Sequence, residues 1–235
     1  TTEIYTLSLH DALPICSLPL PELKLLVVDD NSPDGTGDLA EKLAAETGRV
    51  QVLHRTGKQG LGTAYIAGFR HCLDQGDEAV CQMDADFSHP PQKVVELVEA
   101  LQDCDVAIGS RYVPGGQLDE RWPIWRRGLS AFGNFYARTI LNMRLRDVTG
   151  GFRLWRASAL RTIPWERVRS NGYVFQVETA YLGYLLGLRY REIPIYFADR
   201  RWGESKMSLR IQLEAARRVW GLLWMYRDLR SARQR

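Results

Sequence analysis

The sequence predicts a single α/β domain, with a mostly parallel sheet flanked by helices and an amphipathic helix at the C-terminus. Two observations carry this prediction. Short apolar segments alternate with helical patterns of about a dozen residues, an order typical of parallel sheets. The chain has 235 residues, of which 45% are hydrophobic and 25% charged, so it can bury one large core and lacks the composition of a disordered protein.

The expected elements follow in order along the chain. An apolar strand over residues 23–28 ends in acidic and turn-forming residues, and leucines at helical spacing follow it. A helix that ends at Gly76 separates a strand over 50–54 from one over 79–83, and Pro90 and Pro91 begin the next helix. The remaining elements are a strand over 106–110, helices over 122–142 and 173–186, a strand over 189–197 and a tail helix.

The end of the apolar segment 79–83 is the most informative stretch, because Asp84 and Asp86 stand there two residues apart. Side chains at that spacing share one face of a strand, and ligands of open α/β sheets bind at the carboxyl ends of strands. Carboxylate oxygens suit Mg²⁺ or Mn²⁺, which keep part of their coordination shell for phosphate oxygens and water. We therefore expect a divalent cation that bridges this pair to a diphosphate. The plainer alternative is an Asp-rich turn that caps the next helix.

A glycine-rich loop follows the strand over 50–54. Gly60 and Gly62 open a helix, as the glycines of dinucleotide-binding loops do. Tyr65 stands where that pattern has its third glycine, and the chain has no phosphate-binding Gly-Lys-Ser/Thr sequence. We predict only a tight entry into the helix.

Positive charge is concentrated at the C-terminus. Residues 207–235 contain seven arginines and two acidic residues, a net charge of +5, while the whole chain carries +3. A basic amphipathic helix here would attract phosphate-rich partners, either nucleic acid or an anionic membrane face, and a solvated basic face is the alternative. Residues 122–142, which mix arginines with aromatic side chains, allow the same two interpretations. No apolar run approaches the roughly 20 residues of a membrane-spanning helix.

Residues 1–16 do not fit the pattern of the rest. They lack the basic start and apolar centre of a secretory signal, and they resemble sequencing-adapter DNA read in translation. We expect a non-native leader there in place of the true first strand, the main domain over 17–206 and the tail helix over 207–235. The four cysteines have no paired spacing and are expected to be reduced thiols of a cytosolic protein.

Seven motifs together resemble the dolichol-phosphate or polyprenol-phosphate mannose synthases, which are family-2 inverting glycosyltransferases, and in particular their subgroup without transmembrane helices. The motifs are DDNSPDGT at 29–36, GLGTAY at 60–65, DADFSHP at 84–90, GSRY at 109–112, TGGFR at 149–153, YVFQVE at 173–178 and GESK at 203–206. The resemblance implies a GT-A fold and transfer of mannose from GDP-mannose to a polyprenyl phosphate, with Mg²⁺ or Mn²⁺. It also implies a peripheral protein at the cytoplasmic face of a membrane, with a membrane-anchoring subunit as a candidate partner and no nucleic acid.

The resemblance further implies roles for individual residues. Donor contacts are expected from Val28, Asp30, Asp84, Ala85, Asp86, Arg111, Arg200 and Lys206. Among these, Asp84, Asp86, Arg111 and Arg200 are expected to be catalytic, and Asp84, Asp86 and Ser88 to lie at the metal. Arg126 and Ser130 are expected at the acceptor phosphate. Gln176 and Glu178 are candidate sugar contacts, although Glu178 could instead pair with an arginine.

An acceptor phosphate of this kind needs no general base, because its second pKa is about 6 and it is already ionised near neutral pH. Three other functions stay open. The donor could be UDP-glucose, or the chain could be a non-catalytic homologue that lacks its first strand or serves a membrane subunit. A sugar-1-phosphate nucleotidyltransferase is the third, although its glycine-rich N-terminal signature is not seen.

Overall fold

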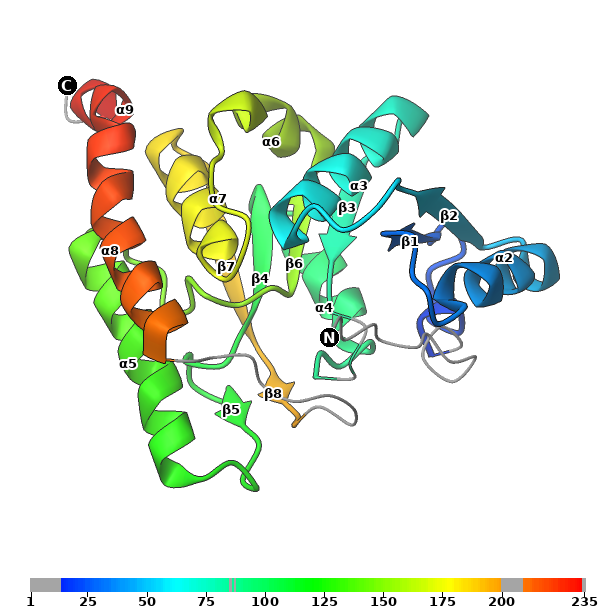
Figure 1. The fold of residues 1–235 in the computed structure, drawn as a ribbon, viewed down its shortest axis with the longest axis horizontal. Coiled ribbons are helices and arrows are strands. Elements are labelled where there is room, and N and C mark those ends of the chain that lie inside the picture. Colours follow the sequence, from blue (N-terminus) through cyan, green and yellow to red (C-terminus); the bar gives the residue numbers. More distant parts are fainter. Residues whose placement is uncertain (1–13, 85, 87, 200–208, 234–235) are drawn as a thin grey trace.

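The computed structural model describes residues 14–84, 86, 88–199 and 209–233, whose elements are labelled in Figure 1. The strands are β1 (Leu25–Asp29), β2 (Val50–His54), β3 (Ala79–Gln82), β4 (Val106–Ser110), β5 (Gln117–Leu118), β6 (Arg153–Arg156), β7 (Tyr190–Pro194) and β8 (Tyr196–Phe197). The helices are α2 (Thr36–Thr47), α3 (Leu61–Gln75), α4 (Lys93–Ala100), α5 (Ile124–Ile140), α6 (Ala157–Thr162), α7 (Val174–Leu185), α8 (Leu209–Met225) and α9 (Arg227–Arg233), with a 3-10 turn over Trp165–Arg167. Within this described part, no helix is long and apolar enough to cross a membrane.

Most strand pairs are parallel, as predicted. β1 pairs with β2, β4 with β7, and β5 with β8, each in parallel. The exception is β6, which runs antiparallel between β3 and β4 and places Leu154 opposite both Cys81 and Ala107. This strand was not predicted, because four residues with an arginine at each end show no recognisable strand pattern. Since β6 is antiparallel to both neighbours, β3 and β4 run in the same direction and end on the same side.

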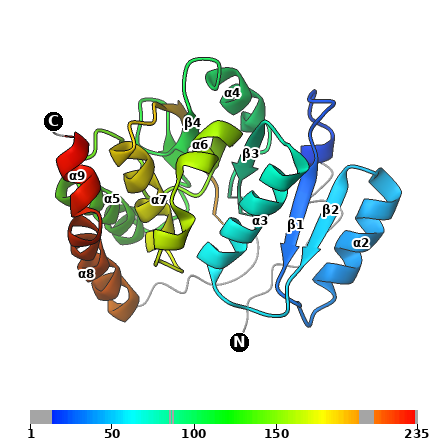
Figure 2. The same cartoon turned by 90° about the horizontal axis from the view of Figure 1, so that it is seen from above.

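The sheet is interrupted between β1 and β3. Among the described strands, β1 pairs only with β2, and β3 pairs only with β6. Helix α3 spans the interruption, because it packs against both β1 and β3 (Figure 2). The predicted leader over residues 1–16 falls mostly outside the described residues, so the replacement of a first strand remains a prediction.

The largest core surrounds α7, the helix predicted over residues 173–186. Its apolar residues occur on every side of the helix, so nearly the whole of α7 is buried. Phe175 and Tyr181 of α7 pack in one cluster with Trp155 of β6 and Phe69 of α3. Burial of one such large apolar side chain contributes about 1.5–3 kcal/mol, so this cluster fixes β6 and α3 relative to α7.

The predicted tail helix is two helices in the structure. α8 ends at Met225 and α9 begins at Arg227, and the buried Tyr226 lies between them. The Tyr226 hydroxyl donates a hydrogen bond to Glu178 of α7 over 2.6 Å. This inward anchor lies at the junction of the two helices. It also holds α8 against the body, where α8 lies beside α5 (Figure 1).

Candidate active site

A cavity of about 1520 Å³ lies where β1, β3 and β4 end. Seven predicted site residues line it, namely Val28, Asp30, Asp84, Arg111, Arg126, Ser130 and Gln176. They come from the ends of three strands and from helices α5 and α7. Because β3 and β4 run in the same direction, the segments that follow them meet at one edge of the sheet, as in other ligand sites of α/β proteins. The same cavity extends between β1 and β3 along Leu26, Val80 and Cys81.

Asp84 is fixed from two sides. Its carboxylate accepts a hydrogen bond from the Tyr65 hydroxyl over 3.0 Å, and its backbone N–H donates to Nδ1 of His89 over 3.0 Å. Burial lowers the pKa of His89, and the nearby Asp84 charge opposes this shift only in part. The imidazole is therefore neutral, with Nδ1 free of a proton to accept the bond. His89 also stacks on Phe152 with the ring centroids 5.2 Å apart, so it holds the turn after β3 without adding charge.

Asp86 lies buried just beyond this turn. Its Oδ1 accepts hydrogen bonds from the backbone N–H and the hydroxyl of Ser88, which is also buried. In the described part of the chain, no group of three or more His, Cys, Asp or Glu side chains could hold a metal. Two carboxylates with one hydroxyl nearby nevertheless fit a hard divalent cation that takes its other ligands from diphosphate and water. Ala85, between the two carboxylates, lies outside the described residues.

Arg111 follows β4 and is clamped by a buried carboxylate. Its Nε and Nη2 donate to the two oxygens of Asp147 over 2.7 and 2.8 Å, and Nη2 also donates to the Thr149 hydroxyl over 2.8 Å. Burial lowers the pKa of Arg111, but the charge of Asp147 and its hydrogen bond, with smaller contributions from Tyr112 and Asp84, together raise it more, so the net shift is upward and the guanidinium stays charged. Among the described residues, no hydrogen bond involves its Nη1. Arg111 is thus a cation fixed by Asp147 at the wall of the cavity.

Arg126 and Ser130, one turn apart on α5, lie at the far wall of the cavity. The Arg126 guanidinium lies 3.7 Å from the ring centroid of Trp122 and contacts the Asp199 carboxylate over 3.2 Å. Ser130 is 2.8 Å from the Tyr112 hydroxyl, and Tyr112 is the neighbour of Arg111 in sequence. Tyr112 and Ser130 therefore connect the segment that carries Arg111 to the helix that carries Arg126.

Val28 and Asp30 lie at the end of β1, on the opposite wall. Asp30 is 3.2 Å from Nε of Arg55, whose Nη2 donates to the Thr63 hydroxyl over 2.8 Å. These contacts hold the glycine-rich loop against β1. Helix α3 begins at Leu61, directly after Gly60, so the loop is the tight helix entry that the sequence predicted, and its Lys58 lines the cavity.

Gln176 is buried and oriented by a second glutamine. The Gln82 amide donates to the side-chain oxygen of Gln176 over 2.7 Å and to the carbonyl of Gly151 over 3.0 Å. The Gln82 oxygen in turn accepts from Trp155 over 3.1 Å. This network leaves the amide nitrogen of Gln176 near Gly151 and Asp84, where a methyl group on Gly151 would lie 3.4 Å from that nitrogen and 3.8 Å from the Asp84 carboxylate.

The sugar contact predicted for Glu178 is not supported. Glu178 is fully buried, and its oxygens accept the backbone N–H groups of Arg169 and Ser170 over 3.1 and 2.8 Å. The third donor is the Tyr226 hydroxyl. The structure does not support the alternative of a simple arginine pair either, because no arginine side chain contacts this carboxylate among the described residues. Glu178 instead ties the loop before α7 to the tail.

Arg200 and Lys206, the predicted basic pair, lie outside the described residues, so their roles remain predictions. Four residues that were not predicted orient the predicted ones, namely Tyr65, His89, Asp147 and Gln82. Tyr65 was noted only as a departure from a glycine pattern. Asp147 precedes one of the quoted motifs, yet nothing in its neighbours along the chain indicates a partner 36 residues away.

Taken together, the described residues place Asp84, Arg111 and Arg126 around one cavity with largely apolar walls, whereas Asp86 and Ser88 follow Asp84 in the chain without lining the cavity themselves. A pair of carboxylates can hold a cation, and guanidinium groups match the oxygens of phosphate. The site can therefore accept a molecule with a diphosphate at one end and a second phosphate near α5.

Comparison with known proteins gives a consistent result. Residues 8–163 match the model of the family described as "Glycosyl transferase family 2". The chain is 48% identical over 214 residues to the undecaprenyl-phosphate mannosyltransferase of Micrococcus luteus, with 90% of this chain and 88% of the relative covered. It is 45% identical over 207 residues to the polyprenol monophosphomannose synthase of Mycolicibacterium smegmatis, with 86% and 77% covered.

Solved structures also resemble this fold. Glucosyl-3-phosphoglycerate synthase from Mycobacterium tuberculosis, in complex with Mn²⁺, uridine diphosphate and glucosyl-3-phosphoglycerate, superposes with a TM-score of 0.58. The match covers 93% of this chain and 74% of that chain at 17% sequence identity. At this identity the likeness supports the GT-A type of fold that the sequence predicted.

Proposed function

The chain belongs to glycosyl transferase family 2, and from this premise we propose that it transfers mannose from GDP-mannose to a polyprenyl phosphate, with inversion at the anomeric carbon. The product would be a polyprenyl β-mannosyl phosphate. The observation that carries this proposal is the cavity that joins Asp84 and Arg111 to Arg126 and Ser130. The names of the two curated relatives supply the sugar and the lipid class, and GDP-mannose is the donor that those names imply.

The reaction proposed here is a direct displacement. An oxygen of the acceptor phosphate attacks the anomeric carbon, the bond from that carbon to the donor diphosphate breaks, and the nucleoside diphosphate leaves with the electron pair. No side chain has to remove a proton, because the acceptor is already ionised near neutral pH. The protein's task is to place two anions of like charge in line, which fixed cations in a partly desolvated cavity can do.

Arg111 and Arg126 are the described cations suited to that task. We propose that the Nη1 group of Arg111 binds phosphate oxygens near the reacting carbon, since Asp147 holds the rest of this guanidinium. Arg126, stacked on Trp122, would hold the acceptor phosphate with Ser130. Arg200 and Lys206 would contact the donor diphosphate, and Val28 and Asp30 its nucleoside. Gln176 is the remaining candidate for a sugar hydroxyl.

We also propose that Asp84 and Asp86, with Ser88 nearby, hold a divalent cation. When bound, such a cation supplies positive charge to the departing diphosphate. Mg²⁺ and Mn²⁺ both suit these oxygen ligands, and a comparison of activity with each ion distinguishes them. A lipid-borne acceptor requires the protein to work at a membrane surface, and we propose a peripheral location at its cytoplasmic face, alone or with a membrane-anchoring subunit.

A donor panel tests the proposal. Radiolabelled GDP-mannose and UDP-glucose are each supplied with undecaprenyl phosphate and Mg²⁺ or Mn²⁺, and the anomeric configuration of the product is read by NMR. We expect transfer from GDP-mannose and a β-linked product. Transfer from UDP-glucose alone would show that UDP-glucose is the donor in place of GDP-mannose. No transfer from either donor would support the non-catalytic alternative.

Two variants at one position test the metal site. Asp86→Asn keeps an oxygen that can accept from Ser88 but removes the charge, so the variant should fold, which circular dichroism checks. We expect turnover to fall about 100-fold or more, as when a group that stabilises the transition state is removed. Asp86→Ala should be at least as damaging. The matched control is Asp74→Ala, an exposed carboxylate on α3, which should keep full activity. Full activity of Asp86→Asn at saturating Mg²⁺ would show that turnover does not depend on a metal held by Asp86.

A further inference from the structure

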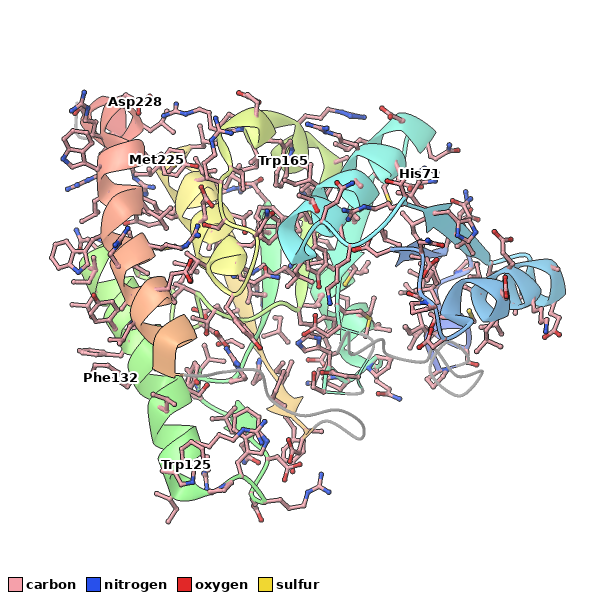
Figure 3. All side chains as sticks on the ribbon, in the orientation of Figure 1. His71, Trp125, Phe132, Trp165, Met225 and Asp228 are labelled. Atoms are coloured by element: carbon pink, nitrogen blue, oxygen red, sulfur yellow. The ribbon has the colours of Figure 1, made fainter. Side chains whose placement is uncertain are left out.

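Helices α5 and α8 lie side by side along one edge of the protein and expose large apolar side chains there (Figure 3). Those of α5 are Ile124, Trp125, Phe132 and Phe135, which are 85%, 69%, 61% and 60% exposed. Those of α8 are Leu213, Trp220 and Trp224, which are 72%, 54% and 75% exposed. We call these seven residues the aromatic face. Single exposed apolar residues are ordinary, but a cluster of this size marks an interaction surface.

The part of the aromatic face on α5 is continuous along the helix. At about 100° per residue, its four members fall within about 100° of the circumference. The other residues inside that sector are Gly128 and Thr139, so it contains no charge. The opposite side of α5 carries the buried Asn134 and Ala137. The helix therefore has an inner face that packs on the protein and a second apolar face that is mostly exposed in the described structure.

The two helices are joined at the aromatic face. Nε1 of Trp220 donates to the Tyr136 hydroxyl over 2.8 Å, and that hydroxyl donates to the Ala216 carbonyl over 3.4 Å. Tyr136 is on α5, and the other two residues are on α8. These bonds hold the two rows of apolar side chains together, so they form one surface rather than two independent stripes.

Charges around the aromatic face are mostly positive. Arg127 and Arg138 flank it on α5 and Arg217 on α8, and none of the three has an ion pair within the described residues. The acidic residue of α8, Glu214, is paired with Arg218 over 2.8 Å. An apolar centre that contains tryptophans and is bordered by arginines matches the boundary between acyl chains and anionic headgroups.

The catalytic cavity reaches this surface. Trp125 and Phe132 of α5 and Leu213 of α8 line the same cavity as Asp84 and Arg111. We propose that the aromatic face rests on an anionic lipid bilayer, so that the cavity opens toward the lipid interface. This inference rests on the proposed function in one respect, because a lipid-linked acceptor explains why the cavity extends to this side.

Vesicle binding tests the proposal without substrates. The protein is floated with phosphatidylcholine vesicles that contain or lack phosphatidylglycerol, and tryptophan quenching by brominated lipids is measured in parallel. We expect binding that is stronger with phosphatidylglycerol and weakens with salt. Trp125→Ser and Trp224→Ser should each weaken binding about tenfold, because each removes an apolar side chain that would enter the lipid.

Matched variants separate apolar from electrostatic contributions. Arg127→Gln with Arg217→Gln should weaken binding to anionic vesicles and leave binding to neutral vesicles unchanged. Leu186→Ser, which removes an exposed leucine at the end of α7 outside the aromatic face, should bind as the unchanged protein does. Absence of binding to both vesicle types would overturn the proposal. So would vesicle binding by Trp125→Ser and Trp224→Ser that is as strong as that of the unchanged protein. So would an oligomer in analytical ultracentrifugation that these two variants dissociate, because a protein would then cover the face.

Activity with two acceptors keeps this proposal distinct from the proposed function. Phe135→Ser, at a position of the aromatic face that does not line the cavity, should transfer sugar normally to a short-chain, water-soluble prenyl phosphate and poorly to a long-chain one in vesicles. Equal loss with both acceptors would show a damaged site and overturn the membrane role of Phe135. Vesicle binding without any sugar transfer would support the membrane-binding role of the aromatic face and refute only the proposed function.

Discussion

The Tyr65 hydroxyl donates a hydrogen bond to Oδ1 of Asp84 over 3.0 Å. Its ring is stacked parallel to that of Phe175, with the centroids 5.8 Å apart, so it cannot swing away from the carboxylate. Burial, and then the Asp84 charge, raise the pKa of Tyr65 well above its usual value, which keeps the hydroxyl protonated as a donor. Tyr65 is therefore a positioning residue for the first carboxylate of the proposed metal site.

Tyr65→Phe removes that hydrogen bond and keeps the ring. A hydrogen bond to a charged group contributes about 1.5–3 kcal/mol, so we expect donor and Mn²⁺ affinity, measured by calorimetry, to fall about tenfold. The matched control is Tyr190→Phe, which removes a hydroxyl bonded to the Ala180 carbonyl outside the cavity. It should leave both affinities unchanged. Unchanged affinity in Tyr65→Phe itself would show that Asp84 is oriented without it.

This tyrosine illustrates what the sequence could and could not predict. The strand ends that carry Asp84 and Arg111 were predictable, because apolar segments and acidic turns are local features of the chain. Partners of these residues were not, since Tyr65 reaches Asp84 from 19 positions away and Asp147 reaches Arg111 from 36. Such pairs depend on which strands are neighbours, and the antiparallel insertion of β6 between β3 and β4 had no local signal.

The same dependence on partners that are distant in the sequence explains why a sugar contact was predicted for Glu178. A buried glutamate at the start of a helix fits a ligand contact as well as a structural one when only the sequence is known. The deciding residue is Tyr226, which is 48 positions away and belongs to a predicted tail helix whose break was not foreseen. Periodicity predicted α8 correctly, but it could not show that one tyrosine of the tail turns inward.

Asp147→Asn should weaken the contacts that hold the Arg111 guanidinium in place. Asp147 is fully buried, and removal of one charge from a buried pair costs about 3–5 kcal/mol. We expect a loss of that order in the free energy of unfolding, measured with urea at pH 7, and weaker binding of anionic ligands. Asp105→Asn is the control, because the Asp105–Arg189 pair is partly exposed and should contribute no more than about 1 kcal/mol.

The stability difference between the unchanged protein and Asp147→Asn should depend on pH, and the direction of its pH dependence follows from the pKa shift of Asp147. Burial raises the pKa of Asp147, but the charge and hydrogen bonds of Arg111 lower it more, so the net shift is downward. A carboxylate with a lowered pKa stabilises the folded state fully above its unfolded pKa of about 3.9, and this stabilisation is lost as the pH falls through the folded value. The difference in unfolding free energy between the unchanged protein and Asp147→Asn should be constant near neutral pH and shrink in acid. A constant difference down to the acid limit would contradict the assignment.

Gly151→Ala should narrow the site without disturbing the fold. A methyl group there would meet only ordinary contacts, 3.4 Å from Gln176 and 3.8 Å from Asp84. We expect an unchanged melting temperature and about tenfold weaker donor binding, because the methyl group occupies space between two proposed donor contacts. Gly109→Ala should instead lower the melting temperature, because its methyl group would lie 2.5 Å from the Phe152 ring and destabilise the core. Normal donor binding by Gly151→Ala would place the sugar elsewhere in the cavity.

Cys72 and Cys81 line the extension of the cavity beside β1, and their reactivity tests how that space is solvated. Burial raises the pKa of Cys72 to about 11 and that of Cys81 to about 12. Because the thiolate is the reactive form, alkylation by iodoacetamide should be slow at pH 7 and accelerate about tenfold per pH unit, with Cys72 about tenfold ahead of Cys81. Peptide mapping by mass spectrometry measures both rates, and the urea-unfolded chain provides the reference. Rates that stay flat with pH would show that access of the reagent limits the reaction, whereas Cys81 reacting as fast as in the unfolded chain would mean that this wall of the cavity is open to water.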